Sequence, residues 1–386
     1  MRSENRTVCV VGAGFTGAVI AHELARSGYR VDVVEERAHV AGNCHTARDA
    51  RTDIMVHVYG PHIFHTDDEE VWTYVNRFGR FGPFVNRVKA VCKGKVYSLP
   101  INLHTINQLL GTNFTPQEAR AWVQQCTTQS DGAPTSFEEQ ALNVVGPDIY
   151  RTFLYGYTRK QWGTEPAQLP ASILRRLPVR FNYNDNYYHS AYQGIPVDGY
   201  TSLVERMLDD ARIHVSLNNR FDASLRDEYR HIFYSGSLDA WFGYALGRLG
   251  YRTLRFETVR GTGDLQGNAV INYCDEDVPW TRSYEHKHFA PWESHEESIL
   301  YREYSAECGP GDVPFYPIRL LRERELLGRY VARANEERGV SFVGRLGTYR
   351  YIDMDAAIRE ALDAARQFIR QDSSGEAPSA FYTAPI

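Results

Sequence analysis

The sequence predicts an α/β fold in which a Rossmann-like dinucleotide-binding domain, assembled from discontinuous segments, is joined by a helical lobe and an antiparallel β-sheet domain. Three observations support this prediction. The chain opens with a strand, a glycine-rich turn, a helix and a second strand; residues 102–176 carry helix signals; and residues 250–306 alternate between polar and apolar side chains. The length of 386 residues accommodates two or three such domains.

The expected domains are each built from separate parts of the chain. We assign residues 1–76, 195–246 and 322–386 to the dinucleotide-binding domain, 102–176 to the helical lobe, and 77–101, 177–194 and 247–321 to the antiparallel sheet domain.

The first forty residues carry the most specific local pattern. An apolar strand at Cys9–Val11 is followed by glycines at the G-x-G-x-x-G spacing, and a helix then extends to Arg26. A second apolar strand ends at Glu35, about 20 residues after the glycines, where dinucleotide-binding domains place an acid that binds a ribose diol. The glycines allow a tight turn, close approach of a pyrophosphate, and close packing of helix on strand; they are Gly12, Gly14 and Gly17. The pattern therefore predicts a dinucleotide with its pyrophosphate at the helix N-terminus.

Composition argues against several classes of partner. The formal net charge of −5 does not favour nucleic acid or a membrane surface, and no apolar stretch is long enough for a transmembrane span. Residues 1–6 lack the apolar core of a signal peptide. The six cysteines are scattered without a C-x-x-C pair, which favours reduced thiols in a cytoplasmic protein. The 25 tyrosines indicate polar, stacking-rich surfaces or a solvated cleft in addition to core positions.

Local signals predict the remaining elements. Thr115-Pro-Gln-Glu118 and Ser136-Phe-Glu-Glu139 are capping boxes, and Gly146 is expected to end the second of these helices. The tail from Ser373 is rich in small and polar residues and is expected to be mobile. Strands are expected at 213–217, 231–236, 251–257, 269–273, 297–304 and 339–344, and a helix at 353–370.

Three histidines lie within nine residues, around a Gly60-Pro61 turn. His62 and His65 are candidate zinc ligands as neutral imidazoles, and the alternative for His57 and His65 is a loop histidine with satisfied hydrogen bonds. No cysteine or carboxylate lies at ligand spacing, however, so we expect no metal site.

Seven further blocks are distinctive. They are His57-Val-Tyr-Gly-Pro-His-Ile-Phe-His-Thr66, Val96-Tyr-Ser-Leu-Pro-Ile-Asn102, Gly156-Tyr-Thr-Arg-Lys-Gln-Trp162, Tyr192-Gln-Gly-Ile-Pro-Val197, Gly267-Asn-Ala-Val-Ile-Asn-Tyr273, Thr281-Arg-Ser-Tyr-Glu-His-Lys-His-Phe289 and Gly344-Arg-Leu-Gly-Thr-Tyr-Arg-Tyr-Ile-Asp353. With these blocks in the order in which the family has them, the chain resembles the UDP-galactopyranose mutases over nearly its whole length. Members of this family interconvert UDP-galactopyranose and UDP-galactofuranose.

The resemblance implies FAD, not NAD, in the glycine-rich site. The residues implied for FAD binding are Gly12, Gly14, Phe15, Thr16, Gly17, Glu35, Arg37, Gly42, Asn43, His62, Gly344, Arg345, Tyr351, Asp353 and Met354.

The resemblance also implies a substrate site. Arg176, on a mobile loop near residues 168–180, and Arg282, from the sheet, would bind the UDP diphosphate, which suits arginine's planar fork of donors. His62 would lie beside the flavin and assist proton transfer. The other implied substrate residues are Tyr157 and Thr158 at the uridine, Trp162 at the base of the loop, Asn272, Tyr187, Tyr316 and Tyr351 at the phosphates and sugar, and Asp353.

In this family the reaction changes no oxidation state overall but requires reduced flavin. N5 of reduced FAD acts as a nucleophile on the anomeric carbon, and the sugar ring recloses through a different hydroxyl. The resemblance implies UDP-galactose or a related UDP-hexose as substrate, a reductant such as NAD(P)H, and a homodimer or higher homo-oligomer.

Other functions remain open from the sequence. An FAD-dependent oxidoreductase of the amine-oxidase type shares the first motif, and a non-catalytic nucleotide-sugar or flavin-binding protein is a third possibility. Departures from the family pattern at Cys274, Trp280 and Ile318–Leu320 leave an N-acetylated or deoxy sugar open as the substrate. Ala41 stands where the family usually has glycine, which is tolerable with ordinary backbone dihedrals.

Overall fold

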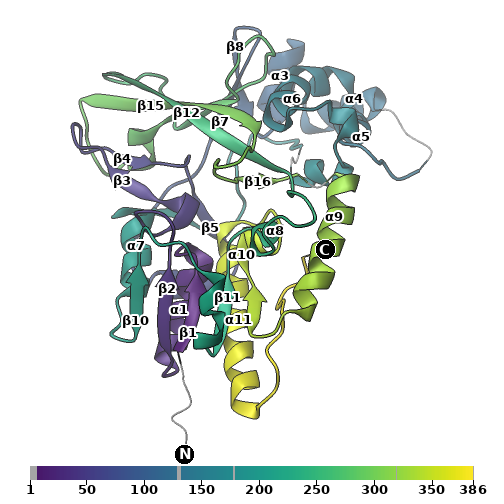
Figure 1. Ribbon diagram of the computed structural model, residues 1–386. Coiled ribbons are helices and arrows are strands. Elements are labelled where there is room, and N and C mark those ends of the chain that lie inside the picture. Colours follow the sequence, from purple (N-terminus) through teal and green to yellow (C-terminus); the bar gives the residue numbers. More distant parts are fainter. Residues whose placement is uncertain (1–6, 128–131, 177–178, 319, 386) are drawn as a thin grey trace, which may run out of the picture.

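Five parallel strands form the sheet that organises the N-terminal motif. The computed structural model describes residues 7–127, 132–176, 179–318 and 320–385. The strand order is β10-β2-β1-β11-β17, with bounds β1 Thr7–Val11, β2 Arg30–Val34, β10 Ile213–Ser216, β11 His231–Tyr234 and β17 Val340–Phe342. Segments more than 300 residues apart thus meet in one sheet (Figure 1). The Rossmann-like prediction is confirmed, including its discontinuous assembly.

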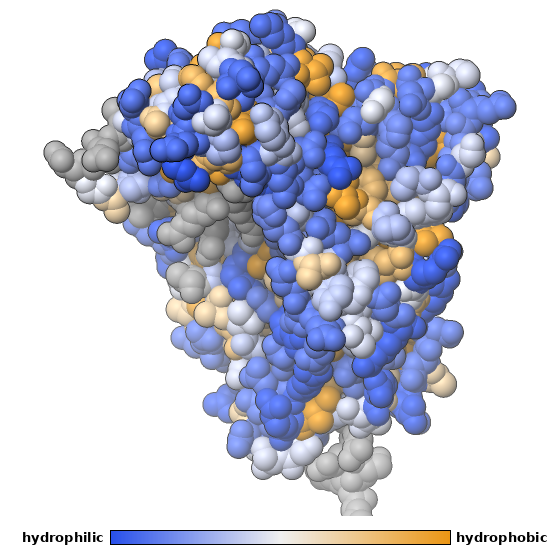
Figure 2. Space-filling view, turned by 180° about the vertical axis from the view of Figure 1, so that it is seen from behind, coloured by the Kyte–Doolittle hydropathy of each residue, from blue (hydrophilic) through white to orange (hydrophobic). Residues whose placement is uncertain are grey.

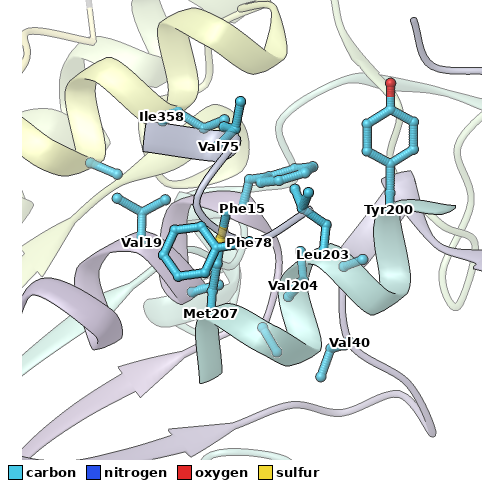
Figure 3. Packing of buried hydrophobic residues seen from close by; sticks show 14 of the residues in the cluster. Phe15, Val19, Val40, Val75, Phe78, Tyr200, Leu203, Val204, Met207 and Ile358 are labelled. Carbon is cyan, nitrogen blue, oxygen red and sulfur yellow. The ribbon is translucent and has the colours of Figure 1, made fainter. Parts of the chain in front are cut away.

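Helices cover both faces of this sheet because its strands alternate their buried side chains. Val8 and Val10 belong to a core shared with α1, α7 and α11, whereas Cys9 faces the core formed with α8 and α9. Figure 3 shows part of the first core, where Phe15, Leu203 and Ile358 come together from three helices. The helices are α1 Phe15–Arg26, α2 Glu69–Val75, α7 Gly199–Leu208, α8 Leu238–Trp241, α9 Leu321–Glu336, α10 Gly344–Gly347 and α11 Met354–Ser374.

The second sheet has seven strands in the order β16-β12-β15-β14-β13-β7-β8. Their bounds are β16 Tyr316–Pro317, β12 Tyr251–Thr262, β15 Glu297–Glu307, β14 Arg282–Glu285, β13 Val270–Tyr273, β7 Val88–Cys92 and β8 Lys95–Leu99. The expected antiparallel pattern holds except between β7 and β13, which pair in parallel. This sheet is therefore mixed, because an early hairpin joins strands that come some 180 residues later in the chain.

The helical lobe lies beside the second sheet (Figure 1). It contains α3 Leu103–Leu110, α4 Pro116–Cys126, α5 Phe137–Ile149, a π-helix Tyr150–Tyr155, α6 Gly156–Trp162, and the 3-10 helices Pro166–Gln168 and Ala171–Arg176. Both predicted capping boxes are present, at Thr115 and Ser136. Gly146 breaks the helical path with φ 73° and ψ 173°, but helical backbone resumes at Pro147, so the expected end of the helix is a kink.

Short strands connect the two main sheets. β3 Thr46–Arg48 pairs with β4 Met55–His57, and β9 Tyr192–Pro196 pairs with both β5 Phe64–Thr66 and β6 Phe81–Gly82. The remaining 3-10 helices are Gly42–Cys44, Ala223–Glu228 and His286–Phe289. The sheet of β5, β9 and β6 crosses the predicted domain boundaries, which remain a prediction.

The C-terminal tail differs from the expectation of mobility. Ser373 and Ser374 belong to the last turn of α11, and the residues after it lie along β17. Phe342 donates its backbone N–H to the carbonyl of Ala380 at 2.8 Å, and Ser341 Oγ donates to the carbonyl of Ser379 at 2.6 Å. These bonds hold a segment whose composition alone resembles a free tail.

The face in Figure 2 is mainly hydrophilic, with hydrophobic residues in small separate groups. Within the described residues, the structure contains no helix that is both long and apolar enough to cross a membrane.

Candidate active site

A cavity of about 930 Å³ opens at the carboxyl ends of the parallel strands. Its lining includes residues that directly follow β1, β2 and β11, which is where open α/β sheets bind ligands. Among the predicted FAD-binding residues, those that line it are Gly12, Gly14, Phe15, Thr16, Glu35, Arg37, Gly42, Asn43, His62, Gly344, Arg345, Asp353 and Met354. Gly17 and Tyr351 are not part of this lining.

The three glycines of the motif meet different surroundings. Gly12 has φ +100°, and a Cβ there would lie 2.2 Å from Ser235 Oγ. A Cβ at Gly17 would lie 1.9 Å from the carbonyl oxygen of Gly12, so this glycine serves the packing of α1 on β1. At Gly14 the nearest protein atom would be 3.9 Å away, and the residue borders the cavity at the start of α1. This open helix N-terminus fits a pyrophosphate.

The far end of the cavity is held by an acid and an arginine. Glu35 is 6% exposed and accepts hydrogen bonds from the backbone N–H groups of Ala13 at 2.8 Å and Arg37 at 3.0 Å. Arg37 Nη2 donates to Asn43 Oδ1 at 2.9 Å. Arg37 Nη1 is buried, and no acceptor among the described residues reaches it. A buried cationic donor beside the cavity fits an anionic or polar part of a dinucleotide.

The loop before Asn43, the partner of Arg37, contains one residue with a strained backbone, Ala41. Ala41 has φ 72° and ψ 1°, in the left-handed region that favours glycine, so the condition of ordinary dihedrals under which alanine is tolerable is not met. Its N–H donates to the carbonyl of Ala13 at 2.8 Å, which ties the loop to the glycine turn. The next residue, Gly42, leaves room for Gly14, whose Cα would lie 3.3 Å from a Cβ at this position.

His62 borders the cavity on the side that faces the second sheet. Its Nδ1 lies 3.0 Å from the carbonyl oxygen of Gly60. Burial lowers the pKa of His62 to about 4, and the positive charges of Arg345 and Arg282 act in the same direction. The ring is therefore neutral at pH 7 and lies within electrostatic reach of both arginines.

Arg282 is the centre of a buried polar cluster on the second sheet. Its Nε and Nη2 donate to the carboxylate of Glu303 at 3.0 and 2.9 Å, and Nη2 also donates to the hydroxyl of Tyr316 at 3.3 Å. Glu303 is 1% exposed and accepts further hydrogen bonds from the hydroxyls of Tyr284 and Thr281. Burial alone lowers the pKa of Arg282, but the Glu303 carboxylate raises it well above its ordinary value. Arg282 is thus a fixed cation.

Tyrosines surround this cation. The rings of Tyr316 and Tyr351 lie 5.5 Å apart, and the guanidinium of Arg345 lies over Tyr351 at 4.9 Å. Tyr157 is within electrostatic reach of Arg282, Tyr187 and Tyr316, and burial raises its pKa. Tyr351 and Arg345 therefore connect the tyrosine cluster to the cavity. The structure brings Arg282, Tyr157, Tyr187, Tyr316, Tyr351 and His62 together.

Asn272 lies beside the same cluster, and Thr158 follows Tyr157 in α6. Asn272 is paired with Arg282 across β13 and β14, and its buried Oδ1 has no donor among the described residues. Thr158 is buried in α6, whose first residue, Gly156, packs against the end of β13. A Cβ at Gly156 would lie 2.2 Å from the carbonyl oxygen of Cys274, so this glycine lets α6 approach the sheet. Trp162 ends α6 and packs on the core of the lobe.

Lys160 holds the loop between β13 and β14. Its Nζ donates to the carbonyl oxygens of Tyr273, Asp275, Val278 and Trp280 at 2.7 to 3.2 Å. Burial lowers the pKa of Lys160 to about 8. Cys274 and Trp280 lie in this connection between the two strands.

Arg176 ends the 3-10 helix Ala171–Arg176, and its side chain lies outside the described part of the structure. Its proposed contact with diphosphate therefore stays a prediction. The chain resumes as a tightly held segment. Arg180 is 7% exposed and donates to the carbonyl oxygens of Asn184 at 3.1 Å, Asn186 and Tyr187.

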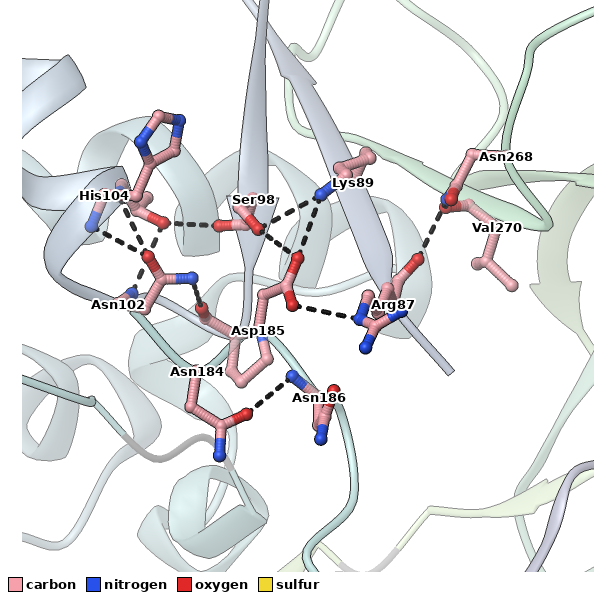
Figure 4. Close-up of polar contacts among 12 residues, drawn as sticks. Arg87, Lys89, Ser98, Asn102, His104, Asn184, Asp185, Asn186, Asn268 and Val270 are labelled. Carbon is pink, nitrogen blue, oxygen red and sulfur yellow. Dashed lines mark hydrogen bonds and ion pairs between the residues drawn. The ribbon is translucent and has the colours of Figure 1, made fainter. Parts of the chain in front are cut away.

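Asp185 anchors the segment 180–187 to the strands β7 and β8. Its carboxylate pairs with Lys89 and Arg87, each at 3.2 Å, and accepts a hydrogen bond from Ser98 Oγ (Figure 4). The backbone N–H of Tyr187 donates to the carbonyl of Asn86 at 2.8 Å. The segment 180–187 thus carries Tyr187 on a rigid support next to the predicted mobile loop.

Glu303, Lys160 and Arg180 were not predicted as functional residues. A single glutamate in an alternating strand is typical of a solvent-facing position, and only the pairing of β14 with β15 places Glu303 beside Arg282. Lys160 stands inside a block that marks the family, which was the one available signal. Arg180 is buried and donates to backbone carbonyl oxygens of its own segment, which agrees with a structural role.

One group of described side chains has the composition of a metal site: Asp264, Glu285 and His288. Lys287 already pairs with Asp264 at 2.6 Å, and Glu285 accepts bonds from two backbone N–H groups and Ser298. These partners give the three residues a structural explanation.

The fold and the cavity define a Rossmann-type, dinucleotide-dependent enzyme with a second, mixed sheet that supplies a cationic, tyrosine-rich cluster. A model for NAD(P)-binding Rossmann-like domains matches residues 10–78, and the UDP-galactopyranose mutase family model matches residues 152–351. The chain belongs to the UDP-galactopyranose mutase family.

Relatives of known name cover the whole chain. A probable UDP-galactopyranose mutase of Klebsiella pneumoniae is 53% identical over 99% of both chains. A dTDP-fucopyranose mutase of Escherichia coli is 49% identical over 95% of this chain and 99% of its own. The crystal structure of a reduced UDP-galactopyranose mutase has a TM-score of 0.73 at 15% identity and covers 94% of this chain and 95% of its own, which shows the shared fold.

Two oxidoreductases also match the chain, one over a short stretch of sequence and one in fold. A nicotine dehydrogenase of Pseudomonas putida is 36% identical over 72 residues, 19% of this chain. A putrescine oxidase structure has a TM-score of 0.58 at 13% identity over 94% of this chain and 99% of its own, a likeness of fold alone.

Proposed function

We propose that the protein binds FAD in the 930 Å³ cavity and interconverts UDP-galactopyranose and UDP-galactofuranose. The observation that carries this proposal is the placement of Arg282 and its tyrosines within electrostatic reach of His62, which borders the cavity. A nucleotide cofactor and a diphosphate-bearing sugar then meet at one point. The 53% identical mutase supports the choice of sugar nucleotide.

Reduced FAD, when bound, supplies a nucleophilic nitrogen for exchange at the anomeric carbon without net redox change. The chain supplies position and charge. Arg282, fixed by Glu303, would stabilise the departing diphosphate as negative charge develops on it. Hydroxyls of Tyr316 and Tyr157 would donate to phosphate without adding charge, which permits its later release. Arg176, from the neighbouring loop, is proposed as the second diphosphate arginine.

His62 is proposed as a neutral acceptor beside the flavin, since its low pKa leaves it uncharged at pH 7. Asn272, with its buried Oδ1, is proposed to accept a hydrogen bond from the substrate. A nicotinamide nucleotide is the proposed source of electrons, and a homodimer or higher homo-oligomer the proposed assembly.

A specific observation favours a second candidate, a mutase for a deoxy sugar on thymidine diphosphate. The Escherichia coli dTDP-fucopyranose mutase is 49% identical over nearly the same length. The two substrates differ in the base, in the 2′-hydroxyl of the ribose and in the hydroxyl on carbon 6 of the hexose, and the described site has no feature that separates them.

The test uses flavin-loaded protein reduced with dithionite. Each furanose nucleotide, UDP-galactofuranose or dTDP-fucofuranose, is incubated with it, and the pyranose form is sought by chromatography. We expect conversion of UDP-galactofuranose with reduced protein and none with oxidised protein. Preferential conversion of the thymidine nucleotide would support the second candidate, and conversion of neither by flavin-loaded, reduced protein would contradict both.

A further inference from the structure

Two histidines that the proposed reaction does not use are buried between the two halves of the site. His57 is 1% exposed and His286 is fully buried, and their rings are nearly parallel with centroids 6.2 Å apart. His57 ends β4, next to the turn that carries His62. His286 directly follows β14, the strand that begins at Arg282. A buried imidazole is costly unless its polar atoms are hydrogen-bonded; Nδ1 of each ring has a partner, whereas Nε2 of each has none among the described residues.

A chain of hydrogen bonds runs from His62 to the ring of His57 and from His57 to the ring of His286. The backbone N–H of His57 donates to Nδ1 of His286 at 3.4 Å, and the backbone N–H of His62 donates to Nδ1 of His57 at 3.4 Å. The N–H of Gly60 donates to the carbonyl of His57 at 3.2 Å. His57 therefore accepts hydrogen bonds from two residues of the turn, while His286 accepts one from His57.

This pattern determines where each ring carries its proton. Nδ1 of His57 and of His286 accepts, so the neutral rings are protonated at Nε2. Burial lowers the pKa of His286 to about 3 and that of His57 well below its usual value, which keeps both neutral. Nδ1 of His62 faces a carbonyl oxygen, which only accepts, so His62 carries its proton on Nδ1 and leaves a lone pair on Nε2.

We propose that His57 and His286 are positioning residues that hold His62 at the cavity with Nε2 as a hydrogen-bond acceptor, in register with the strand that carries Arg282. This inference rests on the proposed flavin site. A flavin gains an N–H donor at N5 on reduction, and a fixed acceptor that lines its cavity favours the reduced form over the oxidised form. By holding His62 as an acceptor, His57 and His286 thereby make reduction of the bound flavin more favourable.

The experiment compares asparagine and leucine at each position in flavin-loaded protein. Asparagine and leucine have similar shapes, but only asparagine keeps an acceptor near the place of Nδ1, so His57→Asn and His57→Leu form a matched pair, as do His286→Asn and His286→Leu. We expect each leucine variant to lose about tenfold in its preference for reduced flavin, a fall of about 30 mV in midpoint potential. The asparagine variants should stay closer to the wild-type potential, and His214→Leu, at an exposed histidine of β10, should not change it.

A measurement on the wild-type protein needs no variant to fold. Ring ¹⁵N shifts of histidine-labelled protein should show the Nδ1–H form for His62 and the Nε2–H form for His57 and His286. An Nε2–H ring at His62, or leucine variants that bind flavin at the wild-type potential, would overturn the inference while leaving the proposed function intact. Wild-type protein that binds no flavin would overturn both.

Discussion

Gly14 and Gly17 are three residues apart in one turn, yet a methyl group would affect them differently. At Gly17 it would meet the backbone of Gly12 at 1.9 Å, whereas at Gly14 it would meet only Gly42 Cα at 3.9 Å and then the cavity. We expect Gly17→Ala to lower the unfolding free energy by about 1–3 kcal/mol or more. Gly14→Ala should keep the wild-type stability of the apoprotein but weaken flavin binding by about tenfold or more, because the methyl group occupies the pyrophosphate site.

Thermal unfolding of the apoproteins and fluorescence titration with FAD check these two variants. Wild-type flavin affinity in Gly14→Ala would place the pyrophosphate elsewhere in the cavity.

A second prediction at the scale of one side chain concerns Glu303, the carboxylate partner of Arg282. Glu303→Gln keeps the size of the group and one acceptor oxygen, but it removes the negative charge and puts an NH₂ donor in place of Oε2, which now accepts from Arg282 and Tyr284. Arg282 then loses its carboxylate counter-charge and one hydrogen bond, so we expect turnover to fall by at least about tenfold. The buried ion pair is also broken, and removal of one partner of such a pair typically costs about 3–5 kcal/mol. Initial rates and urea unfolding measure the two effects, with Glu257→Gln, on the exposed part of β12, as the control. Unchanged turnover would show that Arg282 needs no carboxylate partner.

At the scale of elements, the segment 180–187 supports Tyr187 independently of the flavin cavity. Arg180 donates to three carbonyl oxygens of this segment, and hydrogen bonds from a charged group contribute about 1.5–3 kcal/mol. We expect Arg180→Leu to weaken UDP binding by about tenfold or more while flavin content stays at the wild-type level. Calorimetric titration with UDP and the visible flavin spectrum provide the two readings. Equal losses of UDP and flavin binding would indicate general unfolding and contradict a local role.

The elements that sequence predicted best are those with local causes. The structure confirms the glycine turn with the strand before it, and the capping boxes at Thr115 and Ser136. Each of these depends on neighbours within a few residues. Elements determined by distant partners were less predictable. The parallel pairing of β7 with β13 joins strands some 180 residues apart, and no local pattern distinguishes it from an antiparallel pair.

In the candidate site, too, residues marked by local sequence patterns were predictable, and those placed by distant strands were not. The family blocks pointed to Arg282 and its tyrosines, which the structure brings together. The partner that fixes the arginine, Glu303, could not be predicted, because its burial depends on what covers β15. Ala41 has a left-handed backbone for a similar reason, since the loop must reach back to Ala13.

At the scale of the whole molecule, buried histidines make stability depend on pH. Burial lowers the pKa of His231 and of His286 to about 3, below the value of about 6.5 in the unfolded chain. The unfolded chain therefore binds protons first as pH falls, so stability is complete above about pH 6.5 and is lost progressively below it. Each of these residues should cost about 2 kcal/mol at pH 5 relative to pH 7.

Urea unfolding at pH 7 and pH 5 tests this dependence. His231→Gln should flatten the slope between these pH values, whereas His214→Gln, at an exposed site, should leave it unchanged. An equal slope in both variants would mean that other groups cause the loss.

The hydrogen bonds between the C-terminal segment and β17 have a consequence for how the protein behaves in a crowded solution. β17 is the last strand of the parallel sheet, and an uncovered last strand is a template for pairing with another chain. The backbone N–H of Phe342 instead donates to the carbonyl of Ala380, so the C-terminal segment that contains Ala380 hinders association through this strand. A chain ending at Gly375 should bind flavin as the full chain does but form aggregates on gentle heating, which light scattering would detect.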